Sequence, residues 1–335
     1  MNKSLVVLAC LTFASIHWLP AQTKAPAYRV EKTISVDGNG GWDYLAVDQP
    51  TQRLFISHGT CVDVVDLKTE KLAGQIQNTP GVHGIACVPE LNKGFITAGR
   101  IDSVIVFDLA TLEVLDKVST GKNPDFILYD LFSNRIFTFN GRGNSITAID
   151  AKSNQVVGTL PVSGKPEAAV TNGHGKIFCN IEDKSTVVKF DAITLKIEAE
   201  WPLAPGKEPS GLALDMKNNR LFSACSESGQ VVVMDAADGK IVATLPMGEG
   251  CDGIIFIPED RNAVTSNGEG TMTVVHQDGP DKYKVVQTVE TRKSARTITY
   301  DQSTKKIYLS SAEVKMEDGK RKVTPGSFKI IVASK

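Results

Sequence analysis

The sequence lacks an excess of charge of either sign. Its 335 residues include 37 Lys and Arg against 38 Asp and Glu, which gives a formal net charge of −1. Proteins that bind nucleic acid without sequence preference carry a strongly basic surface, so this balance argues against nucleic acid as a partner. No stretch repeats apolar residues at helical spacing over several turns, which excludes a fold built from helices.

Cofactor motifs are absent as well. The chain contains neither GxxxxGK[ST] nor a glycine fingerprint between a strand and a helix, and it has no CxxC pair. The classical nucleotide-binding loops are therefore excluded. No cofactor is evident from the sequence.

Residues 1–21 have the composition of a secretory signal. Lys3 precedes an apolar stretch that begins at Leu5, and Leu19-Pro20-Ala21 fits a cleavage site. The stretch is too short and too interrupted for a transmembrane helix. We therefore expect export to the periplasm or the exterior of a bacterium. Residues 22–335 would then form a single domain without a transmembrane segment, and we expect a monomer.

What the chain does contain is a repeat. Five short runs rich in β-branched residues end in Asp, and a sixth run ends in His; they are VDVVD (62–66), VIVFD (104–108), ITAID (146–150), VVKFD (187–191), VVVMD (231–235) and MTVVH (272–276). Their last residues lie 41 to 44 positions apart. That period is typical of propeller blades or helical repeats, and the composition favours strands. The terminal Asp residues are interpreted as turn formers.

Each unit is predicted to hold four strands. In the third unit these are 126–130, 135–140, 145–150 and 155–160. The loops GKNPD (121–125), GKPE (164–167) and GKEPS (206–210) are interpreted as crossings, in which Gly turns the chain and Pro begins the next inner strand. Seven inner strands can be counted but only six outer ones, and residues 29–36 have the pattern of the missing outer strand. The prediction is an all-β, seven-bladed propeller whose N-terminal strand completes the last blade and closes the ring.

The chain resembles the YVTN-repeat (YncE-like) bacterial β-propellers, which have WD40-like repeats. The resemblance rests on PSGLALD (209–215), NRLFSAC (219–225), SNGEGTMTVV (266–275) and the third strands with terminal Asp. It covers roughly residues 28–334 and implies an exported seven-bladed propeller. Related propellers include lactonases, a dehydrogenase heavy subunit and a reported DNA binder, so the resemblance implies no single activity and supplies no catalytic motif to transfer.

Polar residues recur where the inner strands begin. In a propeller these positions open on one mouth of the central channel. The predicted ligand-binding residues at this mouth are Asp43, His83, Asp125, Glu167, Ser210, Asp252 and Arg296, together with His58 at the end of a second strand. The residue type at these positions differs from unit to unit, but the residue is polar in every unit. This pattern indicates a polar binding site of defined shape. A wet channel lined by polar groups without a role is the alternative.

Two functions fit this site. The first is a binding or interaction module for a small molecule, a cell-envelope component or a protein. The alternative is a lactonase-type hydrolase in which His58, His83 and the carboxylates act as general acid and base or hold a divalent metal. The spacing of these residues matches no standard metal motif. Trp42, beside Asp43, could stack on a ligand or pack between blades.

Two further features are left open by the sequence. Five cysteines follow residue 21, an odd number that leaves at least one free thiol in an exported protein. Cys225 and Cys251 are expected on the same face of adjoining blades, where they form either a disulfide or two thiols. Residues 312–327 form a charged insertion in the last blade. It is either a lid or partner contact over the mouth, or a solvated loop.

Overall fold

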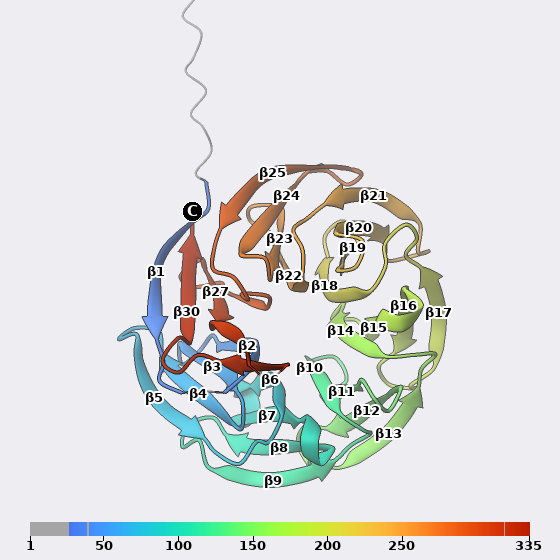
Figure 1. Cartoon of the computed structure of the whole chain (residues 1–335). Coiled ribbons are helices and arrows are strands. Elements are labelled where there is room, and N and C mark those ends of the chain that lie inside the picture. Colours follow the sequence, from blue (N-terminus) through green and yellow to red (C-terminus); the bar gives the residue numbers. More distant parts are fainter. Residues whose placement is uncertain (1–26, 39, 318) are drawn as a thin grey trace, which may run out of the picture.

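The described chain forms a closed ring of seven four-stranded antiparallel sheets (Figure 1). The computed structural model describes residues 27–335 except 39 and 318. The predicted signal segment, residues 1–21, lies outside the described residues. The ring confirms the prediction of a seven-bladed propeller. Among the described residues, no helix has the length and apolar character needed to cross a membrane.

The blades follow one another in chain order, each from its inner to its outer strand. Blade 1 consists of β2 (Trp42–Asp48), β3 (Arg53–His58), β4 (Cys61–Asp66) and β5 (Lys71–Ile76). Blade 2 consists of β6 (Val82–Val88), β7 (Lys93–Ala98), β8 (Ser103–Asp108) and β9 (Val114–Ser119). Blade 3 consists of β10 (Pro124–Asp130), β11 (Arg135–Asn140), β12 (Ser145–Asp150) and β13 (Val156–Pro161). Blade 4 consists of β14 (Pro166–Thr171), β15 (Lys176–Ile181), β16 (Thr186–Asp191) and β17 (Ile197–Pro202). Blade 5 consists of β18 (Pro209–Asp215), β19 (Arg220–Cys225), β20 (Gln230–Asp235) and β21 (Ile241–Pro246). Blade 6 consists of β22 (Cys251–Ile257), β23 (Asn262–Asn267), β24 (Thr271–Gly279) and β25 (Lys282–Glu290).

Blade 7 joins the two ends of the described chain. It consists of β26 (Ile298–Asp301), β27 (Lys306–Ser311), β30 (Lys329–Ser334) and β1 (Arg29–Ser35), in that order from the channel outward. Strand β1 runs antiparallel to β30, from Arg29 opposite Ser334 to Ser35 opposite Lys329. Figure 1 shows the two strands side by side. The prediction that the N-terminal strand closes the ring is confirmed.

Turn chemistry and interblade packing explain the repeat. Asp66 ends β4, and its Oδ1 accepts hydrogen bonds from the backbone N–H groups of Lys68 and Thr69 in the following turn. The terminal Asp residues therefore act as the predicted turn formers. Apolar side chains of neighbouring sheets meet between the blades, as Phe137 and Phe190 do with ring centroids 5.8 Å apart. The core is thus divided among the seven blade interfaces.

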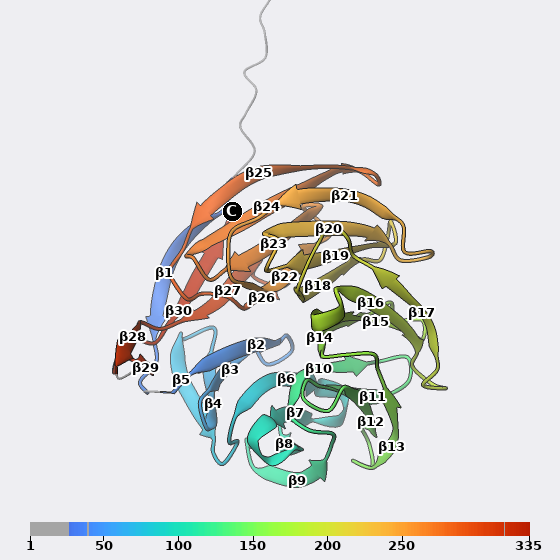
Figure 2. The ribbon, with the colours of Figure 1, turned by 45° about the vertical axis from the view of Figure 1, so that its right-hand side comes forward.

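Short elements interrupt the strand pattern in the connections between strands. Three 3₁₀ helices are described, at Pro89–Leu91 (η1), Gly99–Ile101 (η2) and Glu182–Lys184 (η3). The insertion 312–327 contains a hairpin of β28 (Val314–Glu317) and β29 (Lys320–Val323), with Val314 paired to Val323. Figure 2 shows this hairpin standing out from the ring. The insertion therefore contains a two-stranded hairpin, and its role as a lid or partner contact stays a prediction.

Candidate ligand site at the channel mouth

Backbone bulges place the candidate residues. In blades 1 to 6 the pairing between the first and second strands shifts register at the start of the inner strand; the shifts lie between Trp42 and Leu45, Val82 and Ile85, Pro124 and Ile127, Pro166 and Ala169, Pro209 and Leu212, and Cys251 and Gly253. Each shift spans one of the residues predicted from the sequence. A bulge bends the strand and re-aims a side chain, which lets these residues turn toward the channel mouth.

Five of the predicted residues form one charged network. His83 Nδ1 lies 2.7 Å from Asp43 Oδ2 and 3.5 Å from Asp125 Oδ1. The Arg296 guanidinium donates to Asp252 Oδ2 at 2.6 Å and approaches Asp43 Oδ1 to 3.7 Å. Asp43 thus joins the histidine to the arginine. We call Asp43, His83, Asp125, Asp252 and Arg296 the mouth network.

Burial and neighbouring charges raise the pKa values of three groups in the mouth network. Burial raises the pKa of Asp125 to about 6, and the charge of Asp43 adds to this effect. Burial also raises the pKa of Asp252, although Arg296 opposes the rise. Burial disfavours the charged form of His83, but its hydrogen bond to Asp43 and the two nearby carboxylates outweigh that cost and raise its pKa. Small changes in the surroundings can therefore move protons within the network.

Glu167 lies next to the network and is paired with a lysine. Lys165 Nζ is 2.6 Å from Glu167 Oε1 and also forms an ion pair with Glu182. Glu167 is only 8% exposed. Burial raises the pKa of Glu167 to about 8, Asp125 contributes in the same direction, and Lys165 offsets part of the rise. The site therefore has a second buried carboxyl group that can carry a proton.

His58 does not join the mouth network. Its Nδ1 lies 2.7 Å from Asp63 Oδ2, and its Nε2 accepts a hydrogen bond from the Gly40 N–H. The ring also stacks on Phe328 of blade 7, with centroids 4.3 Å apart. The residue is 4% exposed. The predicted grouping of His58 with His83 is wrong, because the end of β3 directs the ring into the interface between blades 1 and 7.

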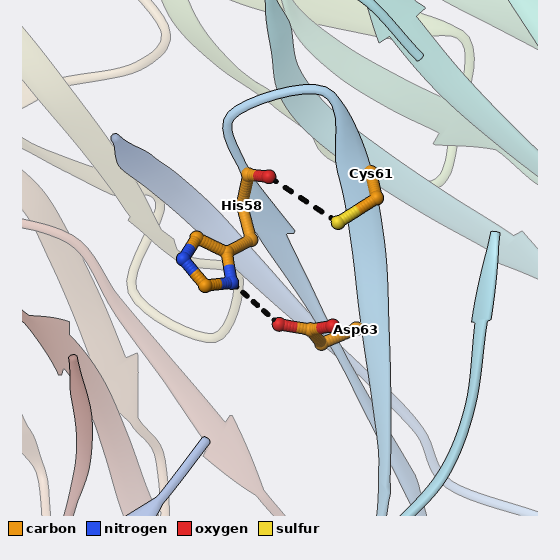
Figure 3. A group of neighbouring side chains, drawn as sticks. All are labelled: His58, Cys61 and Asp63. Carbon is orange, nitrogen blue, oxygen red and sulfur yellow. Dashed lines mark hydrogen bonds and ion pairs between the residues drawn. The ribbon is translucent and has the colours of Figure 1, made fainter. Parts of the chain in front are cut away.

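The group around His58 is poorly suited to a metal. Figure 3 shows His58, Cys61 and Asp63, whose ligand atoms lie close enough together to surround an ion. Both histidine nitrogens already have partners, and the Cys61 thiol donates to the His58 carbonyl. Burial raises the pKa of Cys61 to about 11, which disfavours the thiolate that a metal requires. The group is a satisfied structural network.

The mouth offers a second set of metal-ligand atoms. The ligand atoms of Asp43, His83 and Asp125 also all lie within 4.8 Å of one another. Two carboxylates and one imidazole could hold a divalent cation if the proton on His83 Nδ1 were displaced. The Arg296 guanidinium, 3.7 Å from Asp43 Oδ1, opposes a further positive charge there. Without a cation, the carboxylate of Asp43 is held in place by its contacts with His83 and Arg296.

Ser210 has a structural role. Its hydroxyl contacts the backbone carbonyls of Ala224 and Cys251, and the residue is 5% exposed. These contacts tie blade 5 to blade 6. The bulge at Pro209 therefore turns the hydroxyl toward the neighbouring backbone, and Ser210 is not part of the mouth network.

The five cysteines in the described residues are all free. Cys251 Sγ donates to the Gly253 carbonyl at 3.3 Å, and Cys225 Sγ lies 3.9 Å from the Ser223 hydroxyl. Each thiol thus has a partner within its own blade. The disulfide interpretation of Cys225 and Cys251 is not supported, and the alternative of two buried thiols describes the structure.

Three hollows meet at the mouth network. The hairpin cleft, of about 870 Å³, runs from Trp42, Asp252 and Arg296 to Val314, Lys322 and Val323 of the insertion. The channel cavity, of about 240 Å³, has Asp252 at its rim and mostly apolar walls that include Tyr44 and Phe126. The basic cleft, of about 840 Å³, contains His83 and Asp125 and four cationic side chains: Arg100, Lys122, Arg142 and Lys165.

Sequence reasoning missed the four cations of the basic cleft. Each follows a glycine, in the dipeptides Gly99-Arg100, Gly121-Lys122, Gly141-Arg142 and Gly164-Lys165. The sequence pattern identifies these glycines as turn formers. The lysine or arginine that follows each glycine is the signal that could have predicted a basic cleft. Trp42 packs between blades, as one of its two predicted roles requires: its ring N–H donates to the Ser294 carbonyl, and its ring lies 6.5 Å from that of Phe328. It also lines the hairpin cleft, and stacking on a ligand stays a prediction.

Comparisons with known proteins support the fold and only weakly a family. No known protein-family profile matches the sequence. The uncharacterized protein YncE of Escherichia coli O157:H7 is 25% identical over 166 residues, which cover 46% of this chain and 44% of that protein. The chain thus matches less than half the length of this curated relative.

Solved structures resemble almost the whole ring. The RRP9 WD40 repeats have a TM-score of 0.77 at 9% identity, covering 90% of this chain and 96% of that one. The hydrazine synthase of Kuenenia stuttgartiensis has a TM-score of 0.73 at 14% identity, covering 92% of this chain and 99% of that one. At these identities the likeness shows the propeller fold alone.

Proposed function

We propose that the protein is an exported binding module of the YncE-like type, and that its channel mouth recognises a small polar molecule. The observation that carries the proposal is the mouth network itself. Side chains of blades 1, 2, 3, 6 and 7 converge there, with charges of both signs, at the junction of three hollows. Export rests on the composition of residues 1–21.

The physical properties of the mouth favour recognition of a polar ligand. The two larger hollows have volumes of about 870 and 840 Å³, within the range common for small-molecule sites. His83 and Arg296 offer donors, while Asp43, Asp125 and Asp252 offer acceptors, so a ligand with both kinds of group can be oriented. A closed ring fixes these groups before binding, which limits the entropy lost on association.

The proposal predicts that polar ligands depend on His83. A panel of organic acids, amino acids and sugars is screened by thermal shift, and affinities of the hits are measured by calorimetry. His83→Gln should weaken binding at least tenfold, because it removes the imidazole that lies between Asp43 and Asp125 and can donate to a ligand. His174→Gln, on the exposed turn of the opposite face, serves as the matched control. Hits that bind both variants equally would contradict the proposal.

A lactonase-type hydrolase is the second candidate. It is favoured by the raised pKa values of Asp125, which lies beside His83, and of Glu167, which lies near Asp125, since a general acid and base need pKa values near the working pH. A divalent metal bound by Asp43, His83 and Asp125 is the finer form of this candidate. Elemental mass spectrometry on protein purified without chelator, combined with lactone hydrolysis assays, tests it. About one metal equivalent and turnover, both lost in His83→Gln and kept in His174→Gln, are expected; a metal-free, inactive protein would exclude it.

A further inference from the structure

The basic cleft collects cations from three consecutive blades. Arg100 belongs to η2 in blade 2, and Lys122 lies in the crossing from β9 to β10. Arg142 lies in the turn between β11 and β12, and Lys165 in the crossing from β13 to β14. All four line one hollow of about 840 Å³. In Figure 1 these connections follow one another along one sector of the ring.

Three of the four cations of the basic cleft have no ion-pair partner among the described residues. Lys165 is occupied by Glu167 and Glu182. Arg100, Lys122 and Arg142 are exposed, and none of them forms an ion pair with another residue of the described chain. The carboxylates of the cleft are Asp125, which faces His83, and Asp102, which accepts a hydrogen bond from the Asn123 N–H. Three like charges therefore face one hollow without a counter-charge for each.

Glycines keep the cleft open. A Cβ added at Gly81 would lie 2.6 Å from Arg100 Cγ, so the arginine stem packs directly on the backbone. A Cβ at Gly99 would lie 3.0 Å from His83 Cδ2 and 3.1 Å from Asn123 Oδ1. A side chain at either position would therefore crowd residues that line the cleft. These two glycines thus leave room in which a ligand can meet the charged groups.

We propose that the basic cleft binds a small soluble anion carrying carboxylate or phosphate groups. Two guanidinium groups and a lysine around one hollow match such groups, because arginine can form paired hydrogen bonds to two oxygens of a carboxylate or phosphate. The inference rests on the proposed function, since His83 and Asp125 belong both to the cleft and to the mouth network. The inference goes further because it assigns a negative charge to the ligand and names the residues that bind this charge.

The test uses citrate and inorganic phosphate as probes. Calorimetry on the full exported protein at low ionic strength compares wild type with the double variant Arg100→Gln/Arg142→Gln. The double variant Lys196→Gln/Lys240→Gln loses the same charge at exposed positions on the opposite face and is the matched control. We expect at least tenfold weaker binding in the first variant, no change in the control, and weakening of the wild type with added salt.

The outcomes separate this inference from the proposed function. Equal affinity of all three proteins for a probe, or no measurable binding of either probe to wild type, would overturn the anion site. Citrate binding without phosphate binding would assign the cleft to carboxylates, and the reverse to phosphates. If Arg100→Gln/Arg142→Gln abolishes anion binding while His83→Gln leaves every polar ligand unaffected, the anion site stands and the proposed role of the mouth network fails. Thermal unfolding confirms that each variant is folded.

Discussion

The carboxyl group of Glu167 at the mouth is subject to opposing electrostatic effects. Glu167 is buried beside Asp125, yet it contacts the Lys165 ammonium. Burial and the neighbouring carboxylate favour the protonated form, whereas the lysine favours the ionised form. The balance raises the pKa of Glu167 to about 8, so this residue links the stability of the protein to pH.

The direction of this pH dependence follows from the pKa of Glu167 in the folded and in the unfolded protein. In the unfolded chain Glu167 has its ordinary pKa of 4.5, while in the folded protein it holds its proton up to about pH 8. The folded state therefore binds the extra proton between these values, and its stability relative to the unfolded state falls as pH rises through that window. We expect Glu167→Gln to remove this part of the pH dependence, on the order of a few kcal/mol.

Thermal unfolding from pH 5 to 9 measures the effect. The melting temperature of wild type should fall relative to that of Glu167→Gln as pH rises, with the largest difference above pH 8. Glu113→Gln, at an exposed position on the opposite face, is the control and should follow wild type. Parallel curves for wild type and Glu167→Gln would show that Glu167 does not titrate in this range.

Residue positions could be predicted from the repeat, but side-chain directions could not. Asp43, His83 and Asp125 begin inner strands, and the repeat alone places those positions around the channel. His58 and Ser210 also fit the repeat, yet their side chains are taken by partners that no local pattern reveals. The ring of His58 stacks on Phe328, which lies in another blade and far away in the sequence.

At the scale of strands and turns, the sequence predicted regular elements better than irregular ones. The third blade was predicted at 135–140 and 145–150, and the structure has β11 and β12 at the same residues. Alternating apolar residues and Asp-led turns determine such strands locally. The bulges that aim the mouth residues depend on pairing between strands, so the one-dimensional pattern does not contain them.

The hairpin of the last blade shows the same limit. Its strands have only four residues each and carry many charges, so they lack the apolar alternation that predicts a strand. Gly319, with φ of 72°, occupies the turn between them and is the one local signal. The hairpin matters to function because Val314, Lys322 and Val323 form one wall of the hairpin cleft, opposite Trp42.

At the scale of the whole molecule, the ring depends on strand β1. This strand supplies the outer edge of blade 7, and the segment around it buries Tyr28, Ile34 and Val36. The Tyr28 hydroxyl also donates to Asp260 Oδ2 of blade 6 at 2.6 Å, so the segment bridges the last two blades. Without it, β30 would present an unpaired edge, which invites association with other chains.

We therefore expect removal of residues 27–36 to destabilise the protein and make it associate. Loss of three buried apolar side chains, at roughly 1.5–3 kcal/mol each, predicts a cost of about 5–9 kcal/mol before the lost strand pairing is counted. Thermal unfolding and size-exclusion chromatography compare this variant with one that begins at residue 27. A synthetic peptide of residues 27–37 should bind the shortened protein and restore both its melting temperature and the elution volume of the control. If the shortened protein is as stable and as monodisperse as the control without the peptide, closure by β1 does not hold the ring, and the interfaces between blades must suffice.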